Sequence, residues 1–361
     1  MDYYQMEKSL QVLFERHVPL SRAQNTRLRQ GCVGALLAGS SQLSRIARWV
    51  KQGTQQDSRV QWLRRLLGTP FMTQEWVYYP WVKQALAHFK APVLHVVMDR
   101  THVGDGQTDL LCLALSFRQR GIPLAWDWMA HGSSEQTAQI ALIERGRALL
   151  PAAIPVVFHG DGEFDSVPLL QYLRQLHWDY IVRQPNKKCF RQRPETTWQS
   201  LKSLPVTRRR PIYIPNIELT RRYGYGPVNL FAFYQPLFHK QERRRNITYC
   251  VTSLPITPTL RRVGQRRWGI ECCFKDLKSS GWHWHSSDLT HPQRREGLLT
   301  LLNVSYLWAT CLGRWLCKTG NRRQIDAQGQ RHLSLFRLGW DWLVHRYNMD
   351  LPCPALLTLY Q

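Results

Sequence analysis

The sequence predicts an α/β protein with a helical module in front of its sheet, and three observations support this prediction. Residues 1–88 place apolar side chains at helical spacing. From Pro92 onward, β-branched runs alternate with helical stretches, the order typical of α/β folds. Residues 183–250 lose the helical period and become strand-like and strongly basic. The chain has 361 residues, which suits roughly two or three domains.

The composition indicates a polyanionic partner. Lys and Arg number 49 and Asp and Glu number 25, so the net charge is +24 with His counted as neutral. Charge of one sign on this scale attracts nucleic acid first and an anionic membrane surface second. The membrane interpretation is the weaker of the two, because the basic residues lie among strand-like segments rather than along an amphipathic helix. A hydrophobic fraction of 43% excludes disorder as the main state of the chain.

The helical stretch over residues 1–88 is interpreted as a small DNA-binding module. The segments LSRIARWVKQG and SRVQWLRRLLG place basic residues between apolar ones. A helix that docks on DNA needs this pattern, and a solvated helical bundle shows it as well.

The middle of the chain alternates predicted strands and helices. The strand APVLHVVMD ends at Asp99, and two further strands follow it, joined by a turn at Arg120 and Gly121. After a helix over residues 133–151, the short strand IPVVFHGD ends at Asp161. Two strands thus each end at an acid, at the kind of sheet edge where α/β proteins bind their ligands.

These two acids are candidates for catalysis. Two carboxylates at one edge repel each other unless a cation lies between them, and hard divalent ions suit such a pair. Taken alone, either acid is better explained as the cap of a turn. Asp165, which follows four residues after Asp161, is the alternative choice for the second acid.

A third acid lies on a predicted helix over residues 260–279. In the segment RRWGIECCFKDLKSSGW, three side chains fall within roughly 40° of one another on one helical face: Arg267, Glu271 and Lys278. One acid would then lie between two cations beside the core. An exposed salt bridge between Arg267 and Glu271 is the competing interpretation, and spacing alone does not choose between them.

The segment between the second and third acids is strongly basic. Residues 183–250 contain 15 Lys or Arg against three acids, so half of the net charge lies in under a fifth of the chain. We expect this surface to face phosphates.

Together, the ordered motifs resemble the DDE transposases of bacterial insertion sequences, in the cut-and-paste group with a Tyr-x2-Arg-x3-Glu-x6-Lys signature. Arg267, Glu271 and Lys278 occur at the signature spacing, whereas the signature Tyr falls on Gly264. The segments VVMDRT, IPLAWD, HGDGEF, TSLP and LSLFRLGWDWL also look like parts of that family. The similarity covers most of residues 90–345.

The resemblance implies a ribonuclease-H-like catalytic core formed by residues 89–182 and 251–320. A basic β-rich insertion would occupy residues 183–250, with the helical DNA-binding module at residues 1–88. Residues 321–361 would form a C-terminal helical tail.

The resemblance also implies a chemistry. Asp99, Asp161 and Glu271 would be the catalytic residues and would hold two Mg²⁺ ions, which Mn²⁺ can replace. One ion would activate water or a 3′-hydroxyl, and the other would stabilise the leaving oxygen. Arg267 and Lys278 would bind double-stranded DNA beside the scissile phosphate. The DNA would be both the element ends and the target, held by a homodimer.

Aromatic residues near the signature could stack on a displaced base. We take Trp282 as the first candidate and Trp284 as the second, with Trp268 also beside the signature. The chain contains 15 Trp residues, so burial is the competing interpretation for each of them.

Three function classes stay open at this stage. The first is a metal-dependent transposase that excises and inserts its own element. Gly264 motivates the second, a decayed relative that binds DNA without cutting it. The third is a ribonuclease-H-like nuclease that hydrolyses DNA but does not join it.

The sequence also predicts the compartment. The N-terminal segment MDYYQMEKSLQVLFERHV lacks the apolar run of a signal peptide. The apolar window over residues 298–317 is interrupted by Asn303 and Arg314, which favours a buried helix over a membrane span. Nine cysteines without a C-x-x-C pair fit a reducing compartment. These features predict a cytoplasmic protein that is not associated with a membrane, and the resemblance implies a bacterial protein associated with the nucleoid.

Overall fold

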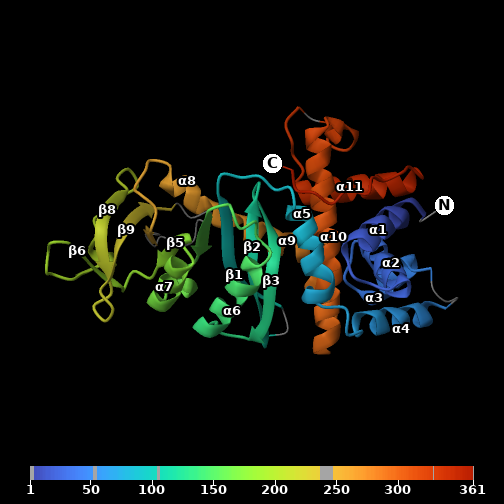
Figure 1. Cartoon of the computed structure of the whole chain (residues 1–361), viewed down its shortest axis with the longest axis horizontal. Coiled ribbons are helices and arrows are strands. Elements are labelled where there is room, and N and C mark those ends of the chain that lie inside the picture. Colours follow the sequence, from blue (N-terminus) through green and yellow to red (C-terminus); the bar gives the residue numbers. More distant parts are fainter. Residues whose placement is uncertain (1–3, 52–54, 104–105, 236–246, 328, 361) are drawn as a thin grey trace.

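The structure is a computed structural model of the chain, and it describes residues 4–51, 55–103, 106–235, 247–327 and 329–360. A long sheet occupies one half of the molecule and helices occupy the other (Figure 1). Helix α10 (Pro292–Lys318) runs between the two halves, so it is the element that joins them.

The first part of the chain is helical, as the apolar spacing predicts. Its helices are α1 (Tyr4–His17), α2 (Arg22–Ala38), α3 (Leu43–Ile46), α4 (Gln56–Leu67) and α5 (Tyr79–Leu86), with short turns of helix at Ala47–Trp49 and Gln74–Tyr78. Helix α2 begins with a capping box, in which Ser21 and Gln24 each accept a hydrogen bond from the other's backbone N–H. Helices α2, α4 and α5 pack against α10.

Ten strands of the described residues form one sheet. They are β1 (Leu94–His102), β2 (Thr108–Phe117), β3 (Arg120–Ala130), β4 (Val156–Gly160), β5 (Asp179–Gln184), β6 (Cys189–Gln192), β7 (Gln199–Ser200), β8 (Ile212–Leu219), β9 (Tyr225–Tyr234) and β10 (Ile247–Thr252). Their order is β3-β2-β1-β4-β5-β10-β9-β8-β6-β7. Strands β1, β4 and β5 are parallel neighbours, and the remaining pairs are antiparallel.

The first five strands and their helices confirm the predicted fold class. An antiparallel β3-β2-β1 meander continues into parallel β4 and β5, with α6 (Gln136–Arg147) and α7 (Val167–Gln175) as the crossover helices. Helix α9 (Trp268–Leu277) packs on β1, β2 and β3. This order and these connections are consistent with a ribonuclease-H-like core.

The strands of the basic segment continue the core sheet. β10 pairs with β5, β9 pairs with β10, and β8 pairs with β9, all antiparallel. The predicted end of the insertion at residue 250 therefore falls inside β10. Residues 208–210 of the first basic triplet are exposed, and residues 243–245 of the second lie outside the described part of the chain.

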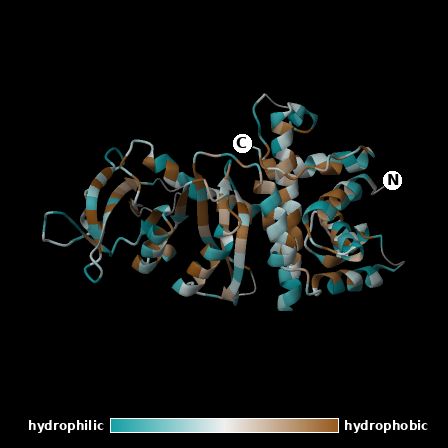
Figure 2. Cartoon of the chain, viewed as in Figure 1, coloured by the Kyte–Doolittle hydropathy of each residue, from teal (hydrophilic) through white to brown (hydrophobic). Residues whose placement is uncertain are grey.

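The C-terminal part of the chain is built around α10. Helix α8 (Leu260–Gly264) and α9 precede it, and α11 (Leu335–Asn348) packs against it. Hydrophobic residues concentrate on the central strands and on the helices around α10 (Figure 2). Within the described residues, no helix has both the length and the apolarity to span a membrane. Residues 298–313 of α10 are all buried in the protein, which confirms the buried-helix interpretation of residues 298–317.

The predicted helical tail is only partly helical. Residues 351–360 have no regular structure, since Pro352 and Pro354 cannot continue a helix. This segment returns to α5, where the N–H of Leu359 donates a hydrogen bond of 3.0 Å to the carbonyl of Ala85.

The turn between β2 and β3 lies two residues before the predicted one. Arg118 and Gln119 form it, with positive φ angles of 45° and 68°, whereas Gly121 lies in the ladder opposite Ser116. A Cβ at position 121 would lie only 2.9 Å from the Cα of Ile270 on α9. Gly121 is therefore required for the close packing of α9 on the sheet and not for the turn.

Candidate active site

Asp99 and Asp161 are neighbours across two parallel strands. Asp99 does not end its strand as predicted, because β1 continues to His102, whereas Asp161 directly follows the last residue of β4. β1 pairs with β4 in a register that matches Val97 with His159. The same register, continued by two residues, places Asp161 beside Asp99. Adjacent strands are about 4.8 Å apart, so the two carboxylates share one edge of the sheet. This is the edge at which the sequence predicts ligand binding.

The turn after β4 fixes the position of Asp161. Its Oδ1 accepts a hydrogen bond of 2.9 Å from the N–H of Glu163, so Asp161 does cap a turn. The Glu163 carboxylate accepts hydrogen bonds from the Arg100 guanidinium (2.9 Å) and from the backbone N–H of Ser134 (2.8 Å). Because Arg100 directly follows Asp99 on β1, this ion pair ties the two aspartate-bearing segments together.

Arg267 connects the sheet to the helix that carries Glu271. The predicted helix over residues 260–279 is interrupted by a tight turn at Gln265–Arg267, so α9 begins at Trp268. From there Arg267 donates a hydrogen bond of 3.2 Å to Asp99 and another to Glu271. The salt bridge between Arg267 and Glu271 exists, but it is half-buried and shared with Asp99 rather than isolated on the surface.

Lys278 lies at the opposite end of α9. It follows the last helical residue, Leu277, and its Nζ donates a hydrogen bond of 2.8 Å to Thr101 and another to the carbonyl of His102. Burial lowers the pKa of Lys278. The side chain therefore reaches the end of the strand that carries Asp99 and does not continue the helical face of Glu271.

The three carboxylates are close enough to influence one another. Burial raises the pKa of Asp99 to about 6, opposed by Arg267 and by the N–H of Arg100, and the charges of Asp161 and Glu271 add to the rise. A divalent cation would relieve this repulsion, and carboxylate oxygens are the ligands that Mg²⁺ and Mn²⁺ prefer. The donor set therefore fits the predicted metal ions.

Two histidines that the sequence analysis did not single out, the half-buried His95 and the buried His159, lie on β1 and β4. Nδ1 of His95 lies 3.0 Å from Nε2 of His159. Burial lowers the pKa of His95 to about 4 and that of His159 well below its usual value. Both rings are neutral at physiological pH, so they add no charge to the site.

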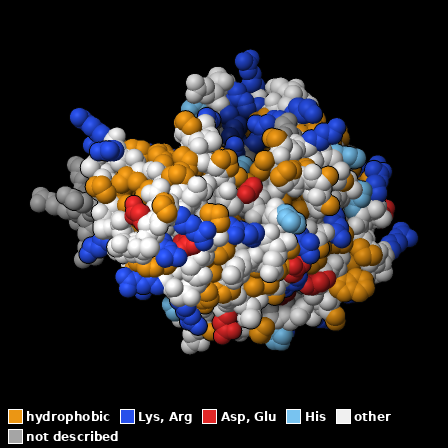
Figure 3. Space-filling model, turned by 60° about the vertical axis from the view of Figure 1, so that its left-hand side comes forward, with side chains coloured by type: hydrophobic (Ala, Val, Ile, Leu, Met, Phe, Trp, Pro, Cys, Tyr) orange, Lys and Arg blue, Asp and Glu red, His pale blue; other side chains and the backbone are white. Residues whose placement is uncertain are grey.

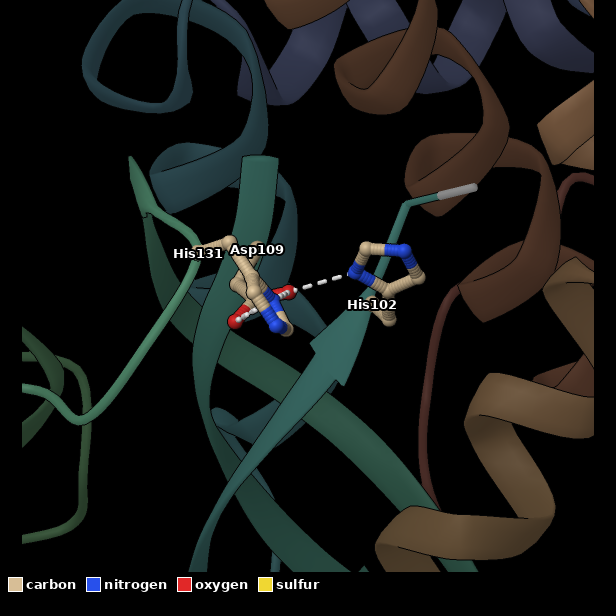
Figure 4. A group of neighbouring side chains, drawn as sticks. All are labelled: His102, Asp109 and His131. Atoms are coloured by element: carbon tan, nitrogen blue, oxygen red, sulfur yellow. Dashed lines mark hydrogen bonds and ion pairs between the residues drawn. The ribbon is translucent and has the colours of Figure 1, made fainter. Parts of the chain in front are cut away.

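A second polar cluster, also absent from the sequence prediction, lies at the carboxyl end of β1. His102 and His131 each direct Nδ1 at the buried carboxylate of Asp109 (Figure 4). Each of the three residues offers an atom that could bind a metal ion, and these atoms lie within 4.8 Å of one another. Burial acts to raise the pKa of Asp109, but hydrogen bonds from His102, Arg100 and His131 lower it to about 2. The cluster forms because His102 on β1 pairs with Asp109 on β2. The spacing of these residues in the sequence does not predict this pairing.

The predicted stacking role of Trp282 is wrong for this structure. Its side chain is fully buried, stacks on Trp340 with ring centroids 4.7 Å apart, and donates a hydrogen bond of 2.8 Å to the carbonyl of Ala35. Trp284 is also buried. Trp268, at the start of α9, is instead 58% exposed, so it is the tryptophan beside the signature that is open to solvent.

A family model described from transposases matches part of the chain, and a solved structure shows a distant similarity. Residues 129–308 match the family model described as "Transposase DDE domain", a range that contains Asp161, Arg267 and Glu271 and begins after Asp99. No curated protein matches the chain. A solved piggyBac transposase synaptic complex with hairpin DNA is similar at 11% identity, with a TM-score of 0.46, over 96% of this chain and 78% of that one. Residues 129–308 are thus similar to the DDE domain of transposases.

Proposed function

We propose that the protein is a transposase that cuts DNA at the ends of an insertion sequence and joins those ends to target DNA. The observation that supports this most strongly is the convergence of Asp99, Asp161 and Glu271 from β1, the end of β4 and α9. The family match supports the same reaction class.

Asp99, Asp161 and Glu271 would hold two divalent metal ions, Mg²⁺ or Mn²⁺. When bound, such ions would activate the attacking oxygen and stabilise the leaving oxygen in an in-line displacement at a phosphodiester. The chain itself supplies the position of the three carboxylates. Arg100 and Glu163 fix the two strand ends relative to each other, and Gly121 lets α9 approach the sheet.

Two basic side chains of the signature, Arg267 and Lys278, would bind the DNA strand. The guanidinium of Arg267 contacts Asp99 and Glu271 and offers the planar donors that phosphates accept. The ammonium of Lys278 lies at the end of β1. Both would bring positive charge to the scissile phosphate.

Gly264 stands where the signature has Tyr. A Cβ at this position would make only ordinary contacts, at 3.7 Å with Ile181 and 3.9 Å with Phe231. The position therefore has room for a Cβ, and the three carboxylates lie together although the signature Tyr is absent. This favours an active enzyme over the decayed DNA-binding relative.

The partners follow from the same reaction. The net charge of +24 suits double-stranded DNA, both as element end and as target. Two ends are processed together in such a reaction, so we propose a homodimer on DNA, with residues 1–88 as a DNA-binding module. The site of action would be the nucleoid in the bacterial cytoplasm.

A cleavage and strand-transfer assay tests the proposal. Purified full-length chain is incubated with DNA that carries the ends of the encoding element and with Mg²⁺ or Mn²⁺, and wild type is compared with Glu271→Gln. The matched control is Glu144→Gln, which removes a half-exposed carboxylate on α6. We expect cutting and joining that require both metal and Glu271, and wild-type rates for the control.

Other outcomes would favour the alternatives. Cutting without joined products would indicate a nuclease that does not transfer strands. Tight DNA binding without cutting in either metal would indicate the decayed relative, and Gly264→Tyr would then be the next variant to test.

A further inference from the structure

We propose that an arginine-lined pocket beside the beginning of α9 binds the phosphate backbone of the DNA strand that flanks the scissile phosphate. The pocket has a volume of about 330 Å³, and four of its lining residues are Arg118, Arg266, Arg314 and Arg331. The inference rests on the proposed function, because it names a further contact of the same DNA substrate.

The four arginines come from parts of the chain that are far apart in sequence. Arg118 lies in the turn between β2 and β3, and Arg266 lies in the turn that precedes α9. Arg314 is near the end of α10, and Arg331 precedes α11. Lys and Arg side chains gather at the top of the view in Figure 3, which is the end of the molecule where α10 finishes in Figure 1.

The pocket concentrates positive charge. Among the described residues that line it, none is acidic. Burial lowers the pKa of Arg314, and the neighbouring charges of Arg118 and Arg331 lower it further. The guanidinium is held there by a hydrogen bond of 2.8 Å from its Nε to the carbonyl of Tyr360. Several cations held together in this way favour a bound anion.

The turn that presents Arg118 is unfavourable for this residue type. Arg118 and Gln119 both have positive φ, a conformation in which hairpin turns prefer Asn and Gly. Strained backbone of this kind collects at functional sites. The turn therefore supports a role for the Arg118 side chain in binding.

The position of the pocket favours a DNA phosphate as its ligand. Arg266 directly precedes Arg267, whose guanidinium contacts Asp99 and Glu271. A DNA strand bound at the three carboxylates would continue past the turn that carries Arg266 and Arg267. Guanidinium groups bind phosphate through paired donors, and backbone contacts of this kind position DNA without reading its sequence. Four of the seven residues that line the pocket are arginines, which favours an anionic ligand over a neutral one.

The salt dependence of DNA binding tests the inference. Affinity for a fluorescein-labelled duplex oligonucleotide is measured by anisotropy over a range of salt concentrations, in EDTA so that no cutting occurs. Three full-length variants are compared with wild type: Arg331→Gln, Arg118→Asn, and a triple variant that combines these two substitutions with Arg314→Gln. We expect Arg118→Asn to keep the conformation of the turn, because Asn accepts positive φ. The matched control is Arg147→Gln, a half-exposed arginine paired with Glu144 on α6.

We expect each pocket variant to make the plot of log affinity against log salt shallower by about 0.9, and the triple variant by roughly 2 to 3. The control should keep the wild-type slope. A wild-type slope in the triple variant, or an equal change in the control, would overturn the inference.

Further outcomes separate this inference from the proposed function. A triple variant that loses calorimetric binding of inorganic pyrophosphate but keeps the wild-type DNA slope would show a site for a small anion and overturn the inference. A chain that binds DNA through the pocket but does not cut it would support the inference and contradict the proposed function. A wild-type chain that binds no duplex would contradict both.

Discussion

Asp99 and Glu271 accept hydrogen bonds from the same guanidinium group, that of Arg267. One carboxylate comes from the first strand of the sheet and the other from a helix that follows the basic segment, so a single side chain connects two parts of the chain that are far apart in sequence. The salt bridge between Arg267 and Glu271 that the helical spacing predicts is therefore one half of a larger contact.

The packing of α9 depends on a missing side chain. We expect Gly121→Ala to destabilise the protein by about 1 to 3 kcal/mol, because the new Cβ would meet the backbone of Ile270 at 2.9 Å. Displacement of α9 should also slow DNA cleavage, since Glu271 would move with it. Denaturant unfolding and the cleavage rate measure the two effects. The control Gly329→Ala meets nothing within 4 Å and should change neither; unchanged cleavage by Gly121→Ala would argue against this packing role.

The cluster around Asp109 holds the end of β1 in place. We expect Asp109→Asn to destabilise the protein by about 3 kcal/mol, because it removes the buried charge that pairs with Arg100 and that accepts hydrogen bonds from His102 and His131. The free energy of unfolding in urea tests this. Asp341→Asn, which removes a more exposed partner of Arg337, serves as the matched control and should cost about 0 to 1 kcal/mol. Equal losses of unfolding free energy in the two variants would contradict a stabilising role for the cluster around Asp109.

The buried carboxylate of Asp276 makes stability depend on pH. Burial raises its pKa to about 6, opposed by the charge of Arg120, from an ordinary value of 3.8. The folded state therefore binds the proton more tightly than the unfolded state, so this group's contribution to stability falls as pH rises from about 4 to about 6. We expect Asp276→Asn to remove this fall and to be more stable than wild type by about 2 kcal/mol at about pH 7.5. Urea unfolding at several pH values measures the free energy of unfolding of both proteins. A difference between them that stays constant from about pH 4 to about pH 7.5 would contradict this role of Asp276.

The two tryptophans beside the signature should behave in opposite ways. Trp282→Ala removes a fully buried ring and should cost about 3 to 5 kcal/mol of stability. Trp268→Ala removes a ring that is 58% exposed and should change stability by about 0.5 kcal/mol or less. Thermal unfolding of the two variants compares them directly. A destabilised Trp268→Ala, or a stable Trp282→Ala, would contradict the exposure of Trp268 and the burial of Trp282.

The sequence predicts local elements well where one face must be buried. The strands that end near Asp99 and Asp161 are apolar runs, and the parallel pairing that brings their ends together follows from the order of strands and helices. The basic segment is strand-like, as predicted, but the pairing of β10 with β5 is a long-range contact that no local pattern encodes.

The errors have physical causes. Gly121 looks like a turn residue, but its lack of a side chain serves the contact with α9. Trp282 follows the signature closely in sequence, yet the chain leaves the helix at Lys278 and turns the indole into the core against Trp340. The cluster at Asp109 depends on cross-strand register, so the spacing of its histidines in the sequence carries no signal.

The central claim is that Asp99, Asp161 and Glu271 act as one metal-dependent site. The most direct test measures the metal-dependent DNA cleavage rates of Asp99→Asn, Glu271→Gln and the double variant, with DNA affinity measured in parallel. If the residues act as a unit, each single variant loses roughly 1,000-fold or more in rate, the double variant is no slower than either, and DNA affinity stays near that of wild type. Near-normal cleavage by either single variant would contradict the claim.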